Sequence, residues 1–342
     1  MIVIRPIEPT DYAGLHACAV ESGHGFTSLP VDETLLRGRI ERSLSAFNQA
    51  DVKTPGPESY LFVAADTETG QIAGVSGIEA AVGLSDAFYH YHLGKVVHHS
   101  PRHNVYNALE TLTLCNDYTG VTELCTLFLR QKFRENGNGK ALSRFRMLFL
   151  AEFRQRFAEQ VIAEMRGVSD ENGLSPFWAW LEKHFFTMDF PRADYLTGVG
   201  EKTFIAELMP KFPIYVNLLD DAAREVIGEV HPNTLPALKL LTSEGFRFRG
   251  YVDIFDAGPT VEADIEQLRS VRHSAVGEVQ LVDSLPASEV ETVIACNRQL
   301  AEFRACQAEL SRSPVGDTFL ITTEVAKALG VSSGDSIRVA PL

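Results

Sequence analysis

The feature that most constrains the fold of this chain is a strand pattern followed by a glycine-rich turn and a long helical pattern. The strand is Glu123-Leu-Cys-Thr-Leu-Phe-Leu-Arg130, and the turn is Arg134-Glu-Asn-Gly-Asn-Gly139. The helical pattern runs from Ala141 to Phe157, with apolar residues recurring on one side. A strand that enters a helix through such a turn is typical of a layered α/β domain.

The glycine turn is also a candidate anion site. The first N–H groups of a helix have no partner within the helix, and the helix dipole attracts negative charge to them. Gly137 and Gly139 lack a Cβ atom, so a phosphate can approach the backbone closely. The spacing differs from the Gly-x-Gly-x-x-Gly of dinucleotide folds and from the Gly-Lys-Ser/Thr of a P-loop. The turn therefore predicts a site for another pyrophosphate, and a structural turn is the alternative.

Length, composition and charge limit the class of protein. A chain of 342 residues with 45% hydrophobic residues has room for a sizeable core and two units, or one elaborated unit with an appendage. The formal charge of −14 argues against nucleic acid as a partner, although a local basic pocket for a phosphorylated cofactor is compatible with it. Neither a long apolar run nor a secretory pattern is visible, so we expect a cytoplasmic protein without membrane contact.

Cysteine and histidine patterns give no sign of a metal site. The five cysteines contain no Cys-x-x-Cys pair, which argues against a zinc site and a disulfide framework. His98 and His99 are adjacent, and neighbouring residues of a strand point to opposite faces. We therefore expect no bound metal.

Strand and helix patterns alternate over most of the chain. Further strands are expected at Ile2–Arg5, Tyr60–Ala65, Gln71–Glu79, Val161–Gly167, Thr203–Met209 and Arg247–Phe255, with at least one near Lys95–His98. Further helices are expected at Asp11–Glu21, Glu33–Phe47, Ser175–His184 and Asn233–Glu244. The tail from about Arg272 is more polar and more strand-like, which indicates a separate, small, β-rich unit.

The glycine turn resembles the coenzyme A loop of the GNAT superfamily of N-acyltransferases, Gln/Arg-x-x-Gly-x-Gly/Ala, and the order of elements is similar as well. The resemblance implies an α/β (α+β) fold, a mixed sheet flanked by helices. It implies a GNAT-like domain at 1–270 with a second partial helix–strand unit near 226–256. Residues 271–342 are expected to form a small barrel-like C-terminal domain.

The same resemblance implies an acyl-CoA co-substrate and the residues that hold it. In that superfamily the strand before the loop carries a bulge whose amides bind the acyl carbonyl and the pantetheine arm. The backbone N–H of Leu127 is then the donor nearest the thioester, where it would stabilise an oxyanion. The alternative interpretation of Leu127 is an ordinary core residue of the strand. The implied cofactor-binding residues are Leu127, Phe128, Leu129, Arg134, Asn136, Gly137, Asn138 and Gly139.

Several longer strings resemble the arginine N-succinyltransferases. They are Thr27-Ser-Leu-Pro, Glu123-Leu-Cys-Thr-Leu-Phe-Leu, Ser175-Pro-Phe-Trp, Phe204-Ile-Ala-Glu-Leu-Met-Pro, Val230-His-Pro and Tyr251-Val-Asp-Ile-Phe-Asp. That family transfers succinyl from succinyl-CoA to the α-amine of L-arginine, the first step of arginine catabolism to glutamate and succinate. The resemblance implies a homo-oligomer, or a hetero-oligomer with a related subunit. An acyltransferase acting on ornithine or another amine, and a non-catalytic acyl-CoA-binding subunit, are the alternatives.

The resemblance places the family's proton donor on His231. Independently of it, His231 precedes the helix predicted at Asn233–Glu244, and the positive end of a helix disfavours imidazolium. A neutral imidazole can accept a proton from the attacking amine and pass it to the CoA sulfur. Many GNAT enzymes use a tyrosine as that acid, but the matching positions here are Leu241 and Leu181. The alternative for His231 is an ordinary loop histidine.

The charged groups of the two substrates require partners of opposite charge. A guanidinium prefers a planar carboxylate, and the succinyl carboxylate requires a basic or amide group. Candidate partners for the guanidinium are Glu79, Glu123, Glu164, Asp253 and Asp256. Arg134 and Asn116 are the candidates for the succinyl carboxylate.

Overall fold

The computed structural model describes residues 1–23, 29–171, 173–185, 188, 192, 196, 207–286, 290–313 and 316–342. The described strands are β1 Ile2–Pro6, β2 Ser59–Asp66, β3 Ile72–Glu79, β4 His90–Ser100, β5 Val105–Cys115, β6 Thr122–Leu129, β7 Gln160–Glu164, β8 Ile214–Tyr215, β9 Arg247–Val252, β10 Pro259–Asp264, β11 Ala275–Val282, β12 Glu291–Asn297, β13 Ala305–Arg312, β14 Thr318–Thr322 and β15 Ser336–Pro341. The described helices are α1 Tyr12–Ser22, α2 Glu33–Asn48, α3 Asn138–Glu152, α4 Pro176–Phe185, α7 Asp221–Glu225, α8 Leu235–Glu244, α9 Arg269–Arg272 and α10 Thr323–Leu329.

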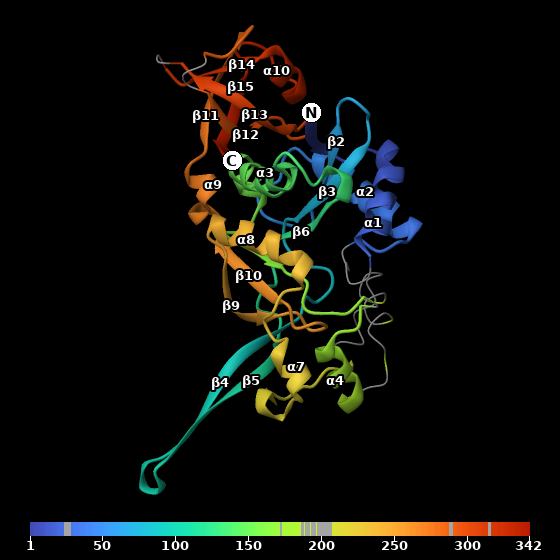
Figure 1. The fold of residues 1–342 in the computed structure, drawn as a ribbon, viewed down its shortest axis with the longest axis vertical. Coiled ribbons are helices and arrows are strands. Elements are labelled where there is room, and N and C mark those ends of the chain that lie inside the picture. Colours follow the sequence, from blue (N-terminus) through green and yellow to red (C-terminus); the bar gives the residue numbers. More distant parts are fainter. Residues whose placement is uncertain are drawn as a thin grey trace.

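The described strands form one mixed sheet that runs the length of the molecule (Figure 1). Its order is β12-β15-β11-β14-β13-β1-β2-β3-β6-β7-β10-β9-β4-β5-β8. Most neighbours are antiparallel, whereas β6 with β7 and β11 with β14 are parallel. The expected fold class, a mixed sheet flanked by helices with a β-rich C-terminal region, is confirmed.

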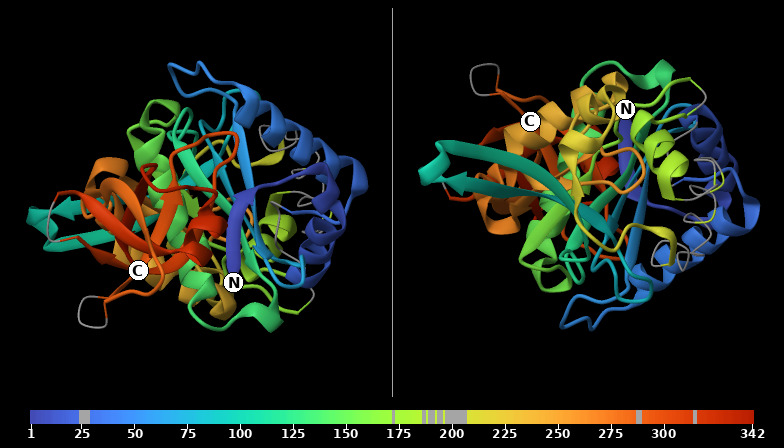
Figure 2. Two further views of the ribbon diagram at one scale, coloured as in Figure 1. Left: turned by 90° about the horizontal axis from the view of Figure 1, so that it is seen from above. Right: turned by 90° about the horizontal axis from the view of Figure 1, so that it is seen from below.

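Helices cover both faces of the central strands, and Figure 2 shows α1 and α2 on one side with α3 on the other. Successive strand side chains point to opposite faces. Phe62 of β2 therefore packs in the core beneath α3 with Phe145 and Phe149. Val63, the next residue, packs in the core formed with α1 and α2. This alternation fixes which residues of the sheet can face α3.

Helix α3 ends at Glu152, earlier than the Phe157 expected from the pattern. A short 3-10 turn, Arg154–Arg156, follows it. The Arg156 side chain is buried there and donates to the carbonyl oxygens of Gln49 and Ala50 and to the Tyr60 hydroxyl. The helix therefore ends before Phe157, because the hydrogen bonds of the buried Arg156 side chain stabilise the 3-10 turn.

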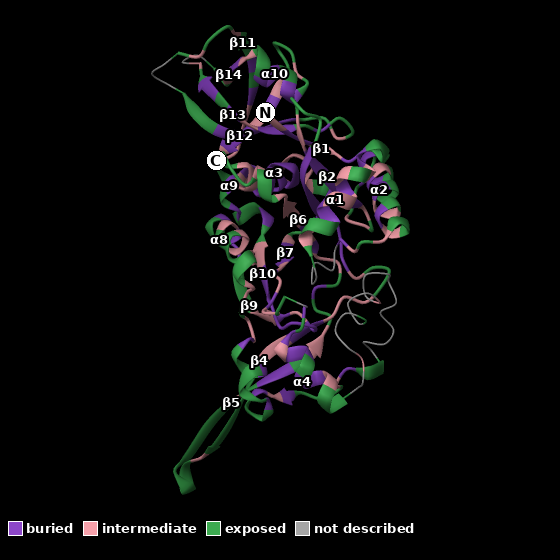
Figure 3. Ribbon diagram, turned by 45° about the vertical axis from the view of Figure 1, so that its right-hand side comes forward, coloured by how far each residue is buried: buried purple, intermediate pink, exposed green. Residues whose placement is uncertain are grey.

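The region predicted to hold a strand near Lys95–His98 forms a long β-hairpin. Strands β4 and β5 are each 11 residues long and pair along their whole length. Figure 3 shows this hairpin projecting from the body, with its outer part exposed. The exposed side chains include Val97 and Tyr106, the latter 70% exposed. We call residues 95–110 the arm.

One other strand expectation is wrong at its end, and another cannot be compared with the structure. The strand expected at Arg247–Phe255 ends at Val252, because Asp253 turns the chain by accepting hydrogen bonds from the N–H groups of Phe255 and Asp256. Strand β10 follows and inserts between β7 and β9, which was not expected. The strand expected at Thr203–Met209 and the string beginning at Thr27 fall largely outside the described residues.

The tail strands have a core of their own and also join the body. Strand β13 pairs with β1 through Ile4 and Ala305, so the sheet continues across the junction. Glu152, at the end of α3, accepts hydrogen bonds from Arg298 and Arg338 of the tail. Among the described residues, no helix is long and apolar enough to cross a membrane.

Candidate functional site

The site begins where the two parallel strands β6 and β7 separate. They pair only at Thr122 with Val161 and at Glu123 with Ile162, and then diverge. Because the following residues of each strand have no parallel partner, a gap opens between the strands above α3. A gap of this kind in the middle of a sheet leaves backbone groups available to a ligand.

A β-bulge in β6 adjoins this gap. Gly77 of β3 pairs with Cys125 and Val75 pairs with Phe128, so Thr126 and Leu127 together oppose one residue of β3. Thr126 has φ 54°, which is rare for a β-branched residue. Its buried hydroxyl accepts a hydrogen bond of 2.9 Å from Arg39, which helps to hold this conformation. The bulge implied by the family resemblance is therefore present, and it turns the backbone at Leu127.

The glycine turn caps α3 without a side-chain ligand. Gly137 is the N-cap residue, with φ 78°, and its cap position carries no side-chain hydrogen bond. Arg134 Nε donates to the Leu129 carbonyl and Asn138 Nδ2 donates to the Phe133 carbonyl, so the loop is tied to the end of β6. The N–H of Asn138 donates to the carbonyl of Glu135, so the N–H groups that follow it in the first turn of α3 are the ones that suit an anion.

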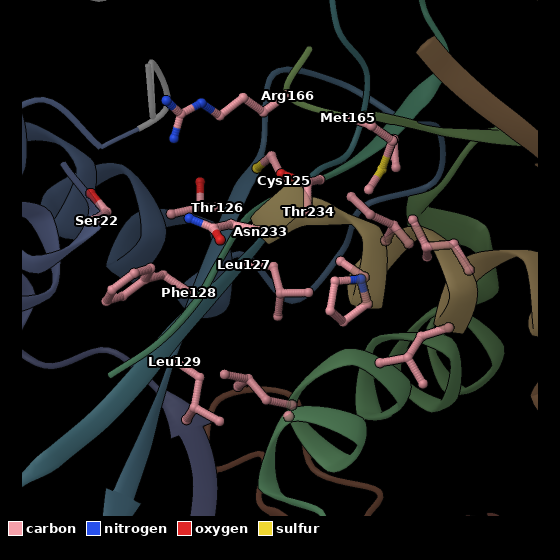
Figure 4. A pocket seen from close by; sticks show the side chains of 18 of the residues that line it. Ser22, Cys125, Thr126, Leu127, Phe128, Leu129, Met165, Arg166, Asn233 and Thr234 are labelled. Atoms are coloured by element: carbon pink, nitrogen blue, oxygen red, sulfur yellow. The ribbon is translucent and has the colours of Figure 1, made fainter. Parts of the chain in front are cut away.

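The gap, the bulge and the glycine turn line one cavity of roughly 790 Å³. Figure 4 shows the side chains of β6 and of the segment at Asn233 and Thr234 around it. Its lining includes every residue predicted to bind the cofactor: Leu127, Phe128, Leu129, Arg134, Asn136, Gly137, Asn138 and Gly139. The volume is in the range of natural ligand sites.

His231 is not among the residues that line this cavity, but it lies two and three residues before the lining residues Asn233 and Thr234. Its N–H donates to the carbonyl of Arg166, and its ring Nδ1 accepts from the N–H of Asn233 at 3.1 Å. Burial, and then the positive charge of Arg166, lower the pKa of His231 below its usual value. The imidazole is therefore neutral near pH 7. Leu241, where many GNAT enzymes have a tyrosine, lines the cavity and offers no proton.

Four of the five carboxylates proposed for the guanidinium line the cavity: Glu123, Glu164, Asp253 and Asp256. Asp256 is buried and accepts from the N–H groups of Gly167 and Gly258. Burial, and then Asp253, raise the pKa of Asp256 well above its usual value.

Glu79 is not part of the cavity lining, since it accepts from Ser59 and lies 3.8 Å from Arg39. Asn116, the alternative to Arg134 for the succinyl carboxylate, also lies outside the lining. Glu164, in contrast, lies against the fully buried His90, with 2.9 Å between Oε1 and Nε2, and burial lowers the pKa of His90 to about 4. The acidic groups gathered at one part of the cavity suit a cationic substrate.

Sequence reasoning missed two arginines of the cavity, Arg146 of α3 and Arg166 after β7. Arg146 follows Leu142 by one helical turn, and both lie on the side of α3 that faces the cavity. A charged residue within an apolar helix face was the signal that could have identified it. The position of Arg166 depends on how far β7 and β6 diverge, for which the sequence gives no signal.

Comparisons with known proteins identify the family of this chain. A family model described as "Arginine N-succinyltransferase beta subunit" matches residues 2–270, and one for its C-terminal domain matches residues 276–341. This chain belongs to the arginine N-succinyltransferase family. Family members named arginine N-succinyltransferase from Salmonella schwarzengrund and Salmonella agona are each 49% identical over 342 residues, covering 100% of this chain and 98% of theirs.

A solved structure extends the family match to three dimensions. The structure of "arginine/ornithine succinyltransferase subunit AI" from Pseudomonas aeruginosa is 36% identical, with a TM-score of 0.89. The match covers 100% of this chain and 98% of that one. The arginine N-succinyltransferase family consists of acyltransferases, and the chain is one of them.

Proposed function

We propose that this protein transfers the succinyl group of succinyl-CoA to the α-amine of L-arginine by direct attack. The observation that carries the proposal is the single cavity in which the glycine turn, the bulged strand and a group of carboxylates meet. The turn suits the cofactor phosphates, the bulge suits the thioester, and the carboxylates suit a guanidinium.

In the proposed reaction the N–H of Leu127 binds the thioester carbonyl and stabilises the oxyanion that forms on attack. The neutral amine attacks the carbonyl carbon, a C–N bond forms, and the C–S bond then breaks. His231 takes the proton that the attacking nitrogen must lose and gives it to the departing sulfur, which leaves as the CoA thiol.

The hydrogen bonds of His231 add a condition to this step. A neutral imidazole carries one proton, and Nδ1 accepts from the Asn233 N–H, so the proton resides on Nε2. For Nε2 to accept a proton, the ring proton must move to Nδ1 and the bond to Asn233 must open. Losing one such bond costs about 1 kcal/mol, which is small beside the benefit of acid–base catalysis.

The acceptor amine is tested by supplying succinyl-CoA with arginine, ornithine and other amines, and measuring the release of free thiol. We expect arginine to give the highest kcat/KM, with acetyl-CoA much poorer as a donor. Ornithine is the second candidate, since the P. aeruginosa relative is named for both amino acids. Thiol release with none of these amines, despite binding of succinyl-CoA, would favour a non-catalytic subunit.

We also propose an assembly of more than one chain and a boundary between units near residue 270. The exposed apolar side chains of the arm support an assembly, because an isolated two-stranded hairpin is only marginally stable in water. The two matched regions, 2–270 and 276–341, support the boundary between 1–270 and 271–342. In the first unit, the succession of α8 and β9 supports the partial helix–strand unit expected near 226–256. A cytoplasmic location stays a prediction, to be checked by cell fractionation.

A further inference from the structure

Arg146 is a buried cation without an anionic partner in the part of the chain that the structure describes. Its side chain is 1% exposed, and its Nε and Nη2 donate only to the carbonyl and hydroxyl oxygens of Ser143, one turn earlier in α3. Burial lowers the pKa of Arg146 to about 10, and the Cys125 thiol raises it, so the guanidinium stays charged at neutral pH. A buried charge without a counter-ion is costly.

Other buried arginines of the body are satisfied differently. Arg144, on the same helix, forms an ion pair of 2.8 Å with the buried Glu244. Arg156 donates to backbone carbonyls and a tyrosine hydroxyl. Neither of them lines the cavity, whereas Arg146 does. The missing counter-ion of Arg146 is therefore expected to come from a ligand in the cavity.

The depth of Arg146 selects the part of the ligand that reaches it. Gly139, at the start of α3, lies beside Leu129 at the end of β6. Arg146 is seven residues further along the helix, or about 10 Å. A step of about 10 Å from Leu129 towards the start of β6 leads to Thr126. The backbone of Arg146 is thus one residue of β6 deeper than Leu127, the proposed thioester donor. Its guanidinium reaches back to Ser143, which is still one helical turn beyond Gly139 at the phosphate loop.

Arg146 and the carboxylates of β6 and β7 lie on different faces of the sheet. Leu124 and Ala163 pack in the core beneath α3, so Arg146 shares their face. Glu123 and Glu164 are their strand neighbours and point to the opposite face. An acyl chain that enters between the strands would thus meet a cation on the α3 face, and the cationic acceptor would meet carboxylates on the other.

We propose that Arg146 binds the terminal carboxylate of a dicarboxylic acyl group, and so selects succinyl-CoA over neutral acyl-CoA donors. The proposal rests on the proposed function for the thioester position, and it assigns the donor specificity of that site. Two N–H groups of a guanidinium match the two oxygens of a carboxylate. Arg134, the candidate from sequence, lies instead at the phosphate loop.

The test compares the binding of succinyl-CoA and butyryl-CoA, which has a methyl group in place of the carboxylate, by calorimetry without an acceptor amine. We expect the unmodified chain to bind succinyl-CoA about 10²-fold more tightly. Arg146→Gln should abolish this preference while keeping the affinity for free CoA. Arg144→Gln, which alters a buried arginine outside the cavity lining, should retain the preference.

Equal binding of the two donors by the unmodified chain overturns the proposal, as does a folded Arg146→Gln variant with the full preference. If that variant fails to fold, Arg146→Lys keeps the charge but loses the planar pair of donors, and it should lose at least half of the preference; full retention overturns the proposal. Because no amine is present, failure of arginine acylation would contradict the proposed function and leave this result standing. Normal acylation without donor preference would contradict only the role of Arg146.

Discussion

At the scale of single residues, His231 has a backbone hydrogen bond that fixes its position and a pKa below the usual value for histidine. Its backbone N–H donates to the carbonyl of Arg166, and its ring Nδ1 accepts from the N–H of Asn233. These bonds hold His231 next to Arg166 and Asn233, which both line the cavity, and they do not use Nε2. A residue that merely finished the loop would not need its ring in a neutral state, so kinetics distinguish the two roles.

We predict that His231→Ala lowers kcat by about 10²-fold or more, because a general acid–base group is lost. The affinity for CoA, measured by calorimetry, should not change. In the unmodified protein, protonation of His231 should reduce kcat/KM as the pH falls. Since burial and Arg166 lower its pKa, the midpoint of that acidic limb should lie below 6.5, the usual value for histidine. A His231→Ala variant that keeps the same limb and rate would contradict the assignment.

The residues of the site differ in how far sequence could predict them. The place of Gly137 and Gly139 in the cavity lining was predictable, because a turn that lets a phosphate approach the backbone favours glycine. The place of Arg146 in the cavity lining was not predictable, because it depends on the alignment of α3 with β6, which tertiary packing decides. The candidate carboxylates Glu123 and Asp256 looked alike in sequence, yet Asp256 binds two backbone N–H groups.

At the scale of elements, the packing of β3 against β6 positions the bulge. Gly74 of β3 leaves no room for a side chain: a Cβ atom there would lie 2.5 Å from the carbonyl oxygen of Phe128. This oxygen belongs to the backbone, so β6 would have to move. The bulge itself could not be seen in the strand pattern of Glu123–Arg130, because Thr126 is an ordinary strand residue by propensity.

We predict that Gly74→Ala lowers kcat/KM for succinyl-CoA by about 10²-fold, because a shift of about 1 Å in a positioning strand has an effect of that size. Steady-state kinetics at saturating arginine measure it. Gly38→Ala in α2 is the matched control, since a Cβ atom at Gly38 meets no atom within 4 Å. It should leave the kinetics intact and stabilise the helix by about 0.5–1 kcal/mol. Equal kinetics for the two variants would show that β6 tolerates the change.

At the scale of the whole molecule, the arm is the part that the body does not need for its own core. The exposed Val97 and Tyr106 lie beyond Gly94 and Thr111, which are paired across the hairpin. The sequence indicated a strand here but not a projecting hairpin. The residue pattern at 95–110 is compatible both with a hairpin that a partner covers and with one that is exposed to solvent.

We predict that joining Gly94 to Thr111 through an Asn-Gly turn, in place of the arm, reduces the assembly to smaller species. The paired positions suit a two-residue turn, so the remaining hairpin should stay intact. Light scattering after size-exclusion chromatography measures the mass. An unchanged mass after the deletion, or a single chain before it, would rule out this role for the arm.

The pairing of β1 with both β2 and β13 has a consequence for synthesis of the chain. Strand β1 leaves the ribosome before its second neighbour, Ala305–Arg312, which lies much later in the chain. Until then, one edge of β1 carries unpaired backbone groups, which is a template for pairing with other chains. The edge of β1 at Ile4 therefore stays open until β13 has been made and pairs with it.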